Sequence, residues 1–409
     1  MAKLALLGGP PIRTAPYPAW PIADAHEEQN VLAVLRSGRW WSTEGQAVTE
    51  FEREWAAYQH LQHCIAVTNG THALEVALLA CNVGAGDEVI VTDYTFFASA
   101  SAIACVNAIP VPVDIDRNTL CIDPDAVLAA IGPRTKAVIA VHVAGHPADL
   151  DRLVEICARH GLALIEDCAH AHGSSWRGTP VGGFGAASAW SFQQSKLLTA
   201  GEGGAIGAKG ADVAARARSF ADCGRRPGEW FYSHFVLGGN YRMTEWQGAV
   251  LRAQLARFDE QHHRRNENAL FLNDELAKLP GIRPQLRDQR TTAQGYYCYV
   301  VNIDEAEFGV SRELVRRALV AEGLPLTMSY PTVHDTAAFT ANDGLAPRVR
   351  SRSGWPDFRQ LHLPNARAAA AETLWFKHQL LLGPIDDAAD LVRALRKLLD
   401  HRDKLKGAQ

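Results

Sequence analysis

The chain of 409 residues has no long apolar run, no excess of basic residues and no paired cysteine motif. Its longest apolar stretches, such as residues 137–145, fall far short of the roughly 18–20 residues that a membrane span needs. The apolar patch after Lys3 is too brief for a secretory signal. A net charge of −4 without a basic stripe argues against a nucleic-acid partner. We therefore expect neither a membrane nor a nucleic acid to be a partner.

Cysteine is present but scattered. The eight cysteines stand singly, with no CxxC pair, at positions 64, 81, 105, 121, 157, 168, 223 and 298. This pattern predicts reduced, buried thiols in a cytoplasmic protein rather than disulfides or a zinc site. His170 and His172 have a spacing that can hold a metal, but no further ligand set is evident in the sequence, so we expect no metal.

Lysine is also scarce, with nine lysines against thirty-two arginines. One of them, Lys196, stands in WSFQQSKLLTAGEGG (residues 190–204), where an apolar strand turns polar and gives way to glycines. Strand alternation places Ser191 and Lys196 on opposite faces, so the strand must bend or end between them if both serve one ligand. The glycines allow a tight loop beside the lysine. Taken alone, Lys196 is equally well explained as a surface residue.

The order of elements indicates an α/β protein. From about residue 60 to 210, short β-branched runs alternate with helical patterns, which is typical of a mainly parallel sheet. From about residue 245, a long helical stretch leads into a mixed segment that contains a further strand and helices. We predict a large domain over residues 1–250, including the N-terminal segment, and a smaller α/β domain over residues 251–409.

Polar groups follow several of the expected strands, at the edge where such sheets bind ligands. Small residues at 68–72 precede a helix whose N-terminus favours an anion, although a plain helix cap explains them as well. Asp167 ends a buried strand, where a carboxylate needs a cation or donors; a capping role is the alternative. An anion cradle, a buried acid and the Lys196 amine match the phosphate, ring nitrogen and aldehyde of pyridoxal phosphate.

Four motifs occur in a fixed order along the chain: VTNGTHALEVAL, EDCAHAHGSSW, SFQQSKLLTAGEGG and GGNYRMTEWQGAV. Together they resemble the DegT/DnrJ/EryC1/StrS aminotransferases, a fold-type-I family that uses pyridoxal 5'-phosphate. The resemblance implies a large domain with a mainly parallel seven-stranded sheet and a smaller C-terminal α/β domain. It also implies that Lys196 bonds covalently to the cofactor, that Asp167 pairs with the ring nitrogen, and that His170 lies beside the ring hydroxyl.

The resemblance implies further cofactor contacts. Gly70, Thr71 and Ser191 match the phosphate-binding positions. Phe96, in DYTFF, matches the aromatic residue that stacks on the ring. Asn240, in GGNYRM, matches an asparagine that reaches the phosphate of the neighbouring subunit's cofactor. A homodimer with shared active sites follows from this last correspondence.

The resemblance implies transamination, because a dehydratase branch of the family has histidine where this chain has Lys196. Stretches such as QGYYCYV look closest to enzymes that aminate keto-cyclitols or keto-sugars in aminoglycoside-like biosynthesis, with L-glutamine or L-glutamate as donor. Trp40, Tyr330 and His334 are the candidate substrate residues; each is alternatively a packing or loop residue. Ala186 stands where many relatives carry an aspartate, which leaves the support of that loop open.

Three alternatives remain open at this point. The GRWW, TNGTHALE and DCAHAHG segments are also similar to 3-amino-5-hydroxybenzoate synthase, and members that aminate nucleotide-linked keto-sugars share the core motifs. A catalytically silent relative that binds the cofactor as a partner subunit belongs to a different class. A nicotinamide-dependent enzyme is disfavoured, because no GxGxxG follows the first strand.

Overall fold

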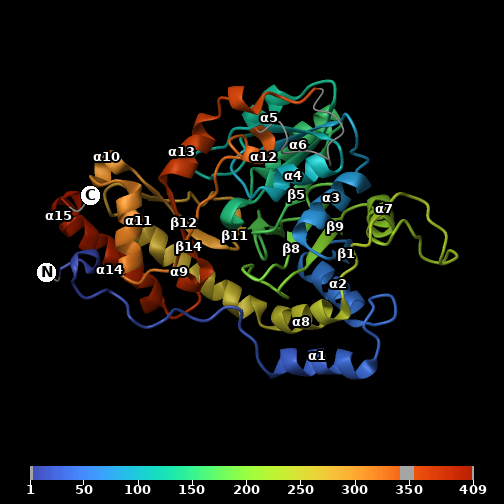
Figure 1. Cartoon of the computed structure of the whole chain (residues 1–409), viewed down its shortest axis with the longest axis horizontal. Coiled ribbons are helices and arrows are strands. Elements are labelled where there is room, and N and C mark those ends of the chain that lie inside the picture. The colour runs from blue at the N-terminus through green and yellow to red at the C-terminus, as the bar shows by residue number, and fades with distance from the viewer. Residues whose placement is uncertain (1–2, 341–353, 408–409) are drawn as a thin grey trace.

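The computed structural model describes residues 3–340 and 354–407 (Figure 1). Its centre is a seven-stranded sheet of order β1-β9-β8-β5-β4-β2-β3. The strands are β1 (His63–Val67), β2 (Glu88–Thr92), β3 (Ile109–Val113), β4 (Thr135–Val141), β5 (Ala163–Asp167), β8 (Ala187–Ser191) and β9 (Gly204–Ala208). The neighbours from β3 to β8 pair in parallel, and only β9 runs antiparallel, to both β1 and β8. The predicted mainly parallel seven-stranded sheet is confirmed.

Helices precede, connect and follow these strands. They are α2 (Ala47–Tyr58), α3 (Gly70–Ala80), α4 (Ala98–Cys105), α5 (Pro124–Ala130), α6 (Leu150–His160) and α7 (Ala211–Ala221). The strands are almost wholly buried, as the β-branched runs predict for a parallel sheet that is covered on both faces. Local signals fix the helix ends: the Asn69 side chain accepts from His72 N–H and begins α3, and Gly161 in a left-handed conformation ends α6.

A second unit is built on the antiparallel sheet β10-β12-β14-β13. Its strands are β10 (Ile282–Pro284), β12 (Cys298–Ile303), β13 (Leu326–Thr327) and β14 (Thr373–Lys377). The helices α8 (Glu245–Ala256) and α9 (Phe258–Leu276) run along one side of the molecule from the large sheet to this unit (Figure 1). The unit's apolar core also draws on α11 (Arg312–Ala321) and α14 (Ile385–Asp400).

Shorter elements complete the fold. A three-stranded sheet joins β11 (Thr291–Ala293) to β6 (Ser175–Trp176) and β7 (Thr179–Pro180). The remaining helices are α1 (Ala25–Ser37), α10 (Glu305–Phe308), α12 (Ala337–Thr340), α13 (Pro364–Glu372) and α15 (Arg402–Lys406), with short 3-10 turns at Ala5–Leu7, Val143–Gly145, Phe358–Gln360 and His378–Leu381. Within the described ranges, no helix combines the length and apolar character needed to cross a bilayer.

The apolar packing differs from the predicted division at residue 250 in two places. Leu4, near the N-terminus, is fully buried in the core of the C-terminal unit. In the other direction, Val333, Phe358 and Ala366 pack into the core of the large sheet. Both ends of the chain therefore lie at the C-terminal unit (Figure 1), and the domain boundaries at 1–250 and 251–409 stay a prediction.

Candidate active site

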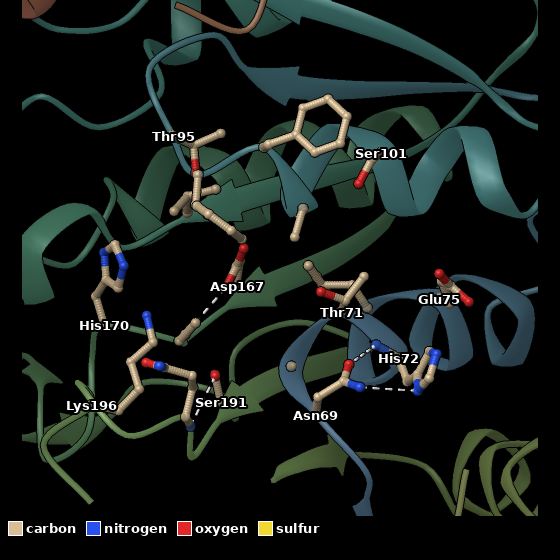
Figure 2. Close-up of a pocket in the computed structure, with 18 of the residues that line it drawn as sticks. Asn69, Thr71, His72, Glu75, Thr95, Ser101, Asp167, His170, Ser191 and Lys196 are labelled. Atoms are coloured by element: carbon tan, nitrogen blue, oxygen red, sulfur yellow. Dashed lines mark hydrogen bonds between the residues drawn. The ribbon is translucent and has the colours of Figure 1, made fainter. Parts of the chain in front are cut away.

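A cavity of about 850 Å³ opens at the carboxyl ends of the parallel strands. Its walls come from the ends of β5 and β8, the first turns of α3 and α4, and segments of the C-terminal unit. Figure 2 shows Lys196, Asp167 and His170 gathered on one side of the cavity, with Asn69 and Thr71 across it. The topology thus brings together polar groups that are far apart in the sequence, as expected for a sheet of this type.

Lys196 stands on the loop between β8 and β9. The strand β8 ends at Ser191, and the chain then turns so that Lys196 N–H donates to Gln193 O at 2.8 Å. Ser191 and Lys196 therefore do not lie on one strand, and strand alternation does not force their side chains to opposite faces. The lysine is only 9 % exposed, and burial lowers the pKa of its amine to about 8, although the charge of Asp167 opposes this.

Asp167 is the last residue of β5 and is buried. Two donors hold its carboxylate: Ser99 Oγ–H donates to Oδ2 at 2.8 Å and Ala169 N–H donates to Oδ1 at 3.1 Å. Burial raises the pKa of Asp167, while these two donors and the charge of Lys196 act in the opposite sense. A cationic group in the cavity would favour the ionised carboxylate.

His170 has a defined tautomer. Ala144 N–H donates to its Nδ1 at 3.3 Å, so the ring proton is on Nε2, which lies 3.0 Å from the hydroxyl oxygen of Tyr330. Burial, and next the charge of Lys196, hold the pKa of His170 well below its usual range, so the ring is neutral. His170 therefore donates to Tyr330 and presents no charge to the cavity.

The N-terminus of α3 forms the far wall. Gly70 and Thr71 are its first two residues, and their N–H groups have no acceptor within the helix. Gly70 packs against Ser191, where a Cβ at position 70 would lie 2.7 Å from the Ser191 Cβ. Only glycine allows the helix to begin this close to the end of β8. Small residues, free N–H groups and the helix dipole make this wall suitable for a phosphate.

Comparisons with known proteins agree with this geometry. Residues 21–374 match the DegT/DnrJ/EryC1/StrS aminotransferase family. The chain belongs to this aminotransferase family.

Several relatives resemble the chain over nearly all of their length. It is 40 % identical over 427 residues to L-glutamine:2-deoxy-scyllo-inosose aminotransferase of Streptoalloteichus tenebrarius, covering 98 % of this chain and 99 % of the relative. It is 40 % identical to 3-amino-5-hydroxybenzoate synthase of Amycolatopsis mediterranei, covering 90 % and 94 %. A crystal structure of 3-amino-5-hydroxybenzoic acid synthase superposes with a TM-score of 0.86 at 36 % identity, covering 95 % of this chain and 100 % of that one.

The family places the chain among the transaminases, and it implies pyridoxal phosphate as cofactor. The residues present suit that group, since the cavity offers a buried amine, a carboxylate held by two donors and an anion-binding helix end. Of the predicted cofactor residues, the cavity is lined by Gly70, Thr71, Phe96, Asp167, His170, Ser191 and Lys196. Phe96 is half exposed, with its ring centroid 6.1 Å from that of Tyr330.

Asn240 lies outside the cavity of its own chain. It is exposed and forms an isolated antiparallel bridge with Asp222. Trp40 is also outside, 51 % exposed, with Nε1 donating to Leu35 O at 3.3 Å and its ring 5.5 Å from that of Trp246. The roles expected of Asn240 at a neighbouring subunit and of Trp40 at a substrate stay predictions.

The two other predicted substrate residues have different surroundings. Tyr330 lines the cavity, whereas His334 is fully buried outside it. Both Nδ1 and the backbone N–H of His334 lie within hydrogen-bond distance of the Asp93 carboxylate, at 2.6 and 2.9 Å. In this chain, His334 ties the segment after β13 to the end of β2, and direct contact with a substrate stays a prediction.

Three further residues contact the predicted site residues and were not predicted from the sequence. Ser99 holds Asp167, and its only signal is that it follows DYTFFA, in the first turn of α4. Tyr297 lines the cavity beside Lys196, and it lies in the QGYYCYV stretch, which carries the family resemblance but no residue role. Ser195 precedes the lysine and hydrogen bonds the Tyr297 hydroxyl at 2.9 Å. None of these pairings follows from local spacing.

A second polar cluster brings together His142, which follows β4, Glu166 in β5 and Cys168, which follows β5. Glu166 accepts from the N–H groups of Gly182, Phe184 and Gly185 at 2.7–2.9 Å. His142 accepts Ala148 N–H at Nδ1, so Nε2–H donates to Glu166 at 3.2 Å. The loop before β8 is thus held by Glu166, which explains how it is supported without an aspartate at position 186.

Proposed function

We propose that the protein is a pyridoxal-phosphate-dependent aminotransferase that moves an amino group from L-glutamine, or L-glutamate, to a neutral ketone of the keto-cyclitol class. The observation that carries the chemistry is the pairing of a buried amine, Lys196, with a buried carboxylate, Asp167, in one cavity. The observation that favours the acceptor class is the charge of the same cavity, described below. The 40 % identical relative from Streptoalloteichus tenebrarius supports both parts.

The cofactor would occupy the cavity with its parts assigned to different walls. Lys196 would hold its aldehyde carbon, and Asp167 its ring nitrogen. Gly70, Thr71 and Ser191 would hold the phosphate at the start of α3, where the helix dipole favours negative charge. When bound, the ring withdraws electrons from the carbon that carries the migrating amino group. Phe96 and His170 line the same cavity and would shield part of the ring from water.

The chain's own residues supply the acid and base chemistry. The amine of Lys196 is suited to take a proton from the α-carbon of the donor and to return one in the second half-reaction. A pKa of about 8, lowered by burial, keeps a useful fraction of this amine neutral near pH 7. Opposite a cationic ring nitrogen, Asp167 would be held as the carboxylate, whose charge Ser99 Oγ–H and Ala169 N–H also stabilise.

The charges that line the cavity favour an uncharged acceptor. Among the described lining residues, the carboxylates are Glu75, Asp167 and Glu202, whereas Lys196 is the single lysine and no arginine is present. An acceptor with a phosphate or carboxylate would add a further negative charge beside these carboxylates and would compete with the donor's carboxylate for the one lysine of the cavity. A polyhydroxylated ketone without charge avoids this cost.

A second candidate is a 3-amino-5-hydroxybenzoate synthase-like enzyme, favoured by the close superposition with a solved structure of that synthase. The product of that relative is a carboxylic acid, whose negative charge would lie beside the carboxylates of this cavity. A nucleotide-linked keto-sugar carries a diphosphate, to which the same objection applies. A catalytically silent partner subunit is disfavoured by the intact set of Lys196, Asp167 and Ser191.

We further propose a homodimer in which Asn240 of one subunit reaches the phosphate site of the other, in a cytoplasmic protein. Asn240 is exposed and lies outside its own cavity, as this arrangement requires. The eight cysteines are all free thiols, which suits a reducing compartment. Light scattering of the purified protein, with Asn240→Ala assayed for cofactor affinity, tests this part of the proposal.

The function is tested by assaying amine transfer from L-glutamine to three ketones: an uncharged deoxy-inosose, a keto ring that bears a carboxylate, and a nucleotide-linked keto-sugar. We expect the uncharged ketone to have the highest kcat/KM. We also expect Lys196→Ala to lower kcat by at least about 10³-fold, while Lys209→Ala, an exposed lysine, keeps full activity. Preference for either anionic ketone would refute the acceptor class, and an active Lys196→Ala would refute the chemistry.

A further inference from the structure

Tyr297 is a residue of the cavity wall that the proposed function leaves without a role. It directly precedes β12 of the smaller sheet, whereas Lys196 stands on the loop after β8 of the large sheet. The Nζ atom of Lys196 lies 4.2 Å from the centroid of the Tyr297 ring. At this distance the face of an aromatic ring attracts an ammonium group. The two residues, about a hundred positions apart, therefore meet at the reactive amine.

The Tyr297 ring is itself fixed by two further contacts. It stacks on the ring of His170, with 4.2 Å between centroids and 15° between planes. Its hydroxyl lies 2.9 Å from Ser195 Oγ, which in turn donates to Gln193 Oε1 at 2.7 Å. Ser195 and Lys196 are neighbours, so the same bond ties the lysine loop to the ring. Because the Tyr297 ring is held on two sides, it offers the Lys196 amine a fixed contact.

No hydrogen bond or ion pair is made by Lys196 Nζ within the part of the chain that the structure describes; the Tyr297 ring is its directional contact. The charged or titratable groups that face the amine are Asp167 from β5, Cys298 from β12 and the neighbouring histidines. Burial raises the pKa of Cys298 to about 12 and lowers the pKa of His170 and of His172, so these three groups are neutral.

We propose that Tyr297 is a positioning residue whose ring holds the amine of Lys196 whenever this amine is bonded neither to the cofactor nor to a substrate. The inference rests on the proposed function, in which the amine is released in each half-reaction. A long lysine side chain has many rotamers in an 850 Å³ cavity. A fixed resting place keeps the amine on the side of the cavity where Asp167 and His170 lie (Figure 2).

The test measures the free amine directly, in the cofactor-free full-length protein. The rate at which an amine-directed reagent labels Lys196 is followed against pH by peptide mass spectrometry, with exposed Lys209 as an internal reference for the reagent. The variants are Tyr297→Leu, which removes the ring, and Tyr297→Phe, which keeps the ring and removes the bond to Ser195. Phenylalanines with one, two or three ring fluorines at position 297 weaken the π face at nearly constant shape.

The dependence of the labelling rate on pH gives the pKa of the Lys196 amine. Because the Tyr297 ring favours the protonated amine, removal of the ring lowers this pKa. We expect Tyr297→Leu to lower it by about half a unit or more relative to Tyr297→Phe. We expect each fluorine added to the phenylalanine ring to lower the pKa of Lys196 relative to Tyr297→Phe. Equal pKa values in the Leu and Phe variants, or the absence of a trend with fluorination, would overturn the proposal. If Tyr297→Leu does not fold, the fluorinated series decides alone.

This test is independent of transamination. Labelling of Lys196 needs neither cofactor nor substrate, so the proposal about Tyr297 can fail while the enzyme is active. Conversely, the function fails if no cofactor bonds to Lys196, whatever the labelling gives.

Discussion

Asp167 accepts a 2.8 Å hydrogen bond from the hydroxyl of Ser99, which stands in the first turn of the helix that follows β2. The bond joins the end of one strand to the helix after another, and Ala169 N–H holds the second carboxylate oxygen. The carboxylate is therefore fixed before any ligand enters the cavity. Preorganised groups of this kind lose little free energy to reorganisation during a reaction.

The charge of Asp167 is expected to matter more than its shape. Asp167→Asn keeps an oxygen that can accept from Ser99 but loses the negative charge opposite the cofactor ring. We expect turnover to fall by about ten- to a hundredfold, which corresponds to the loss of one charge-assisted hydrogen bond. Steady-state assays measure this, with Asp212→Asn on the surface of α7 as control. Wild-type turnover in Asp167→Asn would show that the charge is not used.

The close contact between α3 and β8 predicts that a larger residue at position 70 weakens cofactor binding. Gly70→Ala places a methyl group 2.7 Å from the Ser191 Cβ and pushes apart the two elements that form the phosphate cradle. We expect cofactor affinity to fall by at least about tenfold, because a small shift misdirects the N–H groups of the first turn. The matched control is Gly84→Ala, where an added Cβ meets nothing within 4 Å. Equal cofactor affinities, measured by absorbance titration, would contradict the assignment.

The buried carboxylate of Glu166 is expected to be a major source of stability. It accepts three backbone N–H groups of the loop before β8 and one imidazole N–H. Glu166→Ala leaves these donors buried without an acceptor, and we expect the free energy of unfolding to fall by about 3 kcal/mol or more. Glu166→Gln, which keeps one carbonyl oxygen, loses less. Chemical denaturation measures both.

The control for Glu166 is Glu155→Ala, an exposed residue of α6, for which we expect a change within about 0.5 kcal/mol. If Glu166→Ala is as stable as this control, the loop is held by other contacts.

The depressed pKa of Lys196 predicts a specific pH dependence of stability. Burial lowers this pKa from 10.5 to about 8, so between these values the unfolded chain binds the proton more tightly than the folded one. Stability therefore rises with pH across this window, as the cost of discharging the amine disappears. Over the whole of this titration, we expect the free energy of unfolding of the wild type to rise by about 3 kcal/mol relative to that of Lys196→Met.

The comparison with Lys196→Met matters because buried tyrosines and cysteines also titrate at high pH and are common to both proteins. The protein is measured free of cofactor, so that the amine can titrate. Denaturation curves at pH 7.5, 8.5 and 9.5 cover about 2 kcal/mol of the expected shift. A difference that stays constant with pH would mean that the lysine amine is not desolvated.

The parts of the fold and site that could be predicted are those encoded locally. The β-branched runs predicted where the strands lie along the chain, and the strand ends at Asp167 and Ser191 predicted two walls of the cavity. The helix start at Gly70 followed from small residues and a capping asparagine. In each case, the residues that decide the structure are adjacent in the chain.

The parts that could not be predicted depend on contacts between distant segments. Tyr297 reaches Lys196 from the other sheet, and Tyr330 reaches His170 across 160 positions. Nothing in the sequence near Glu166 indicates that its carboxylate serves the loop around Gly182, although this resolves the question raised by Ala186. Such pairings are set by how the two sheets pack together, which local spacing does not encode.

The proposed chemistry requires a covalent bond between the Lys196 amine and the cofactor aldehyde. Purified protein with pyridoxal phosphate is reduced with borohydride, digested and analysed by mass spectrometry. We expect a phosphopyridoxyl group on the peptide that contains Lys196, and its disappearance in Lys196→Ala. A tag on another lysine, or no tag in a protein that transfers amines, would contradict the account.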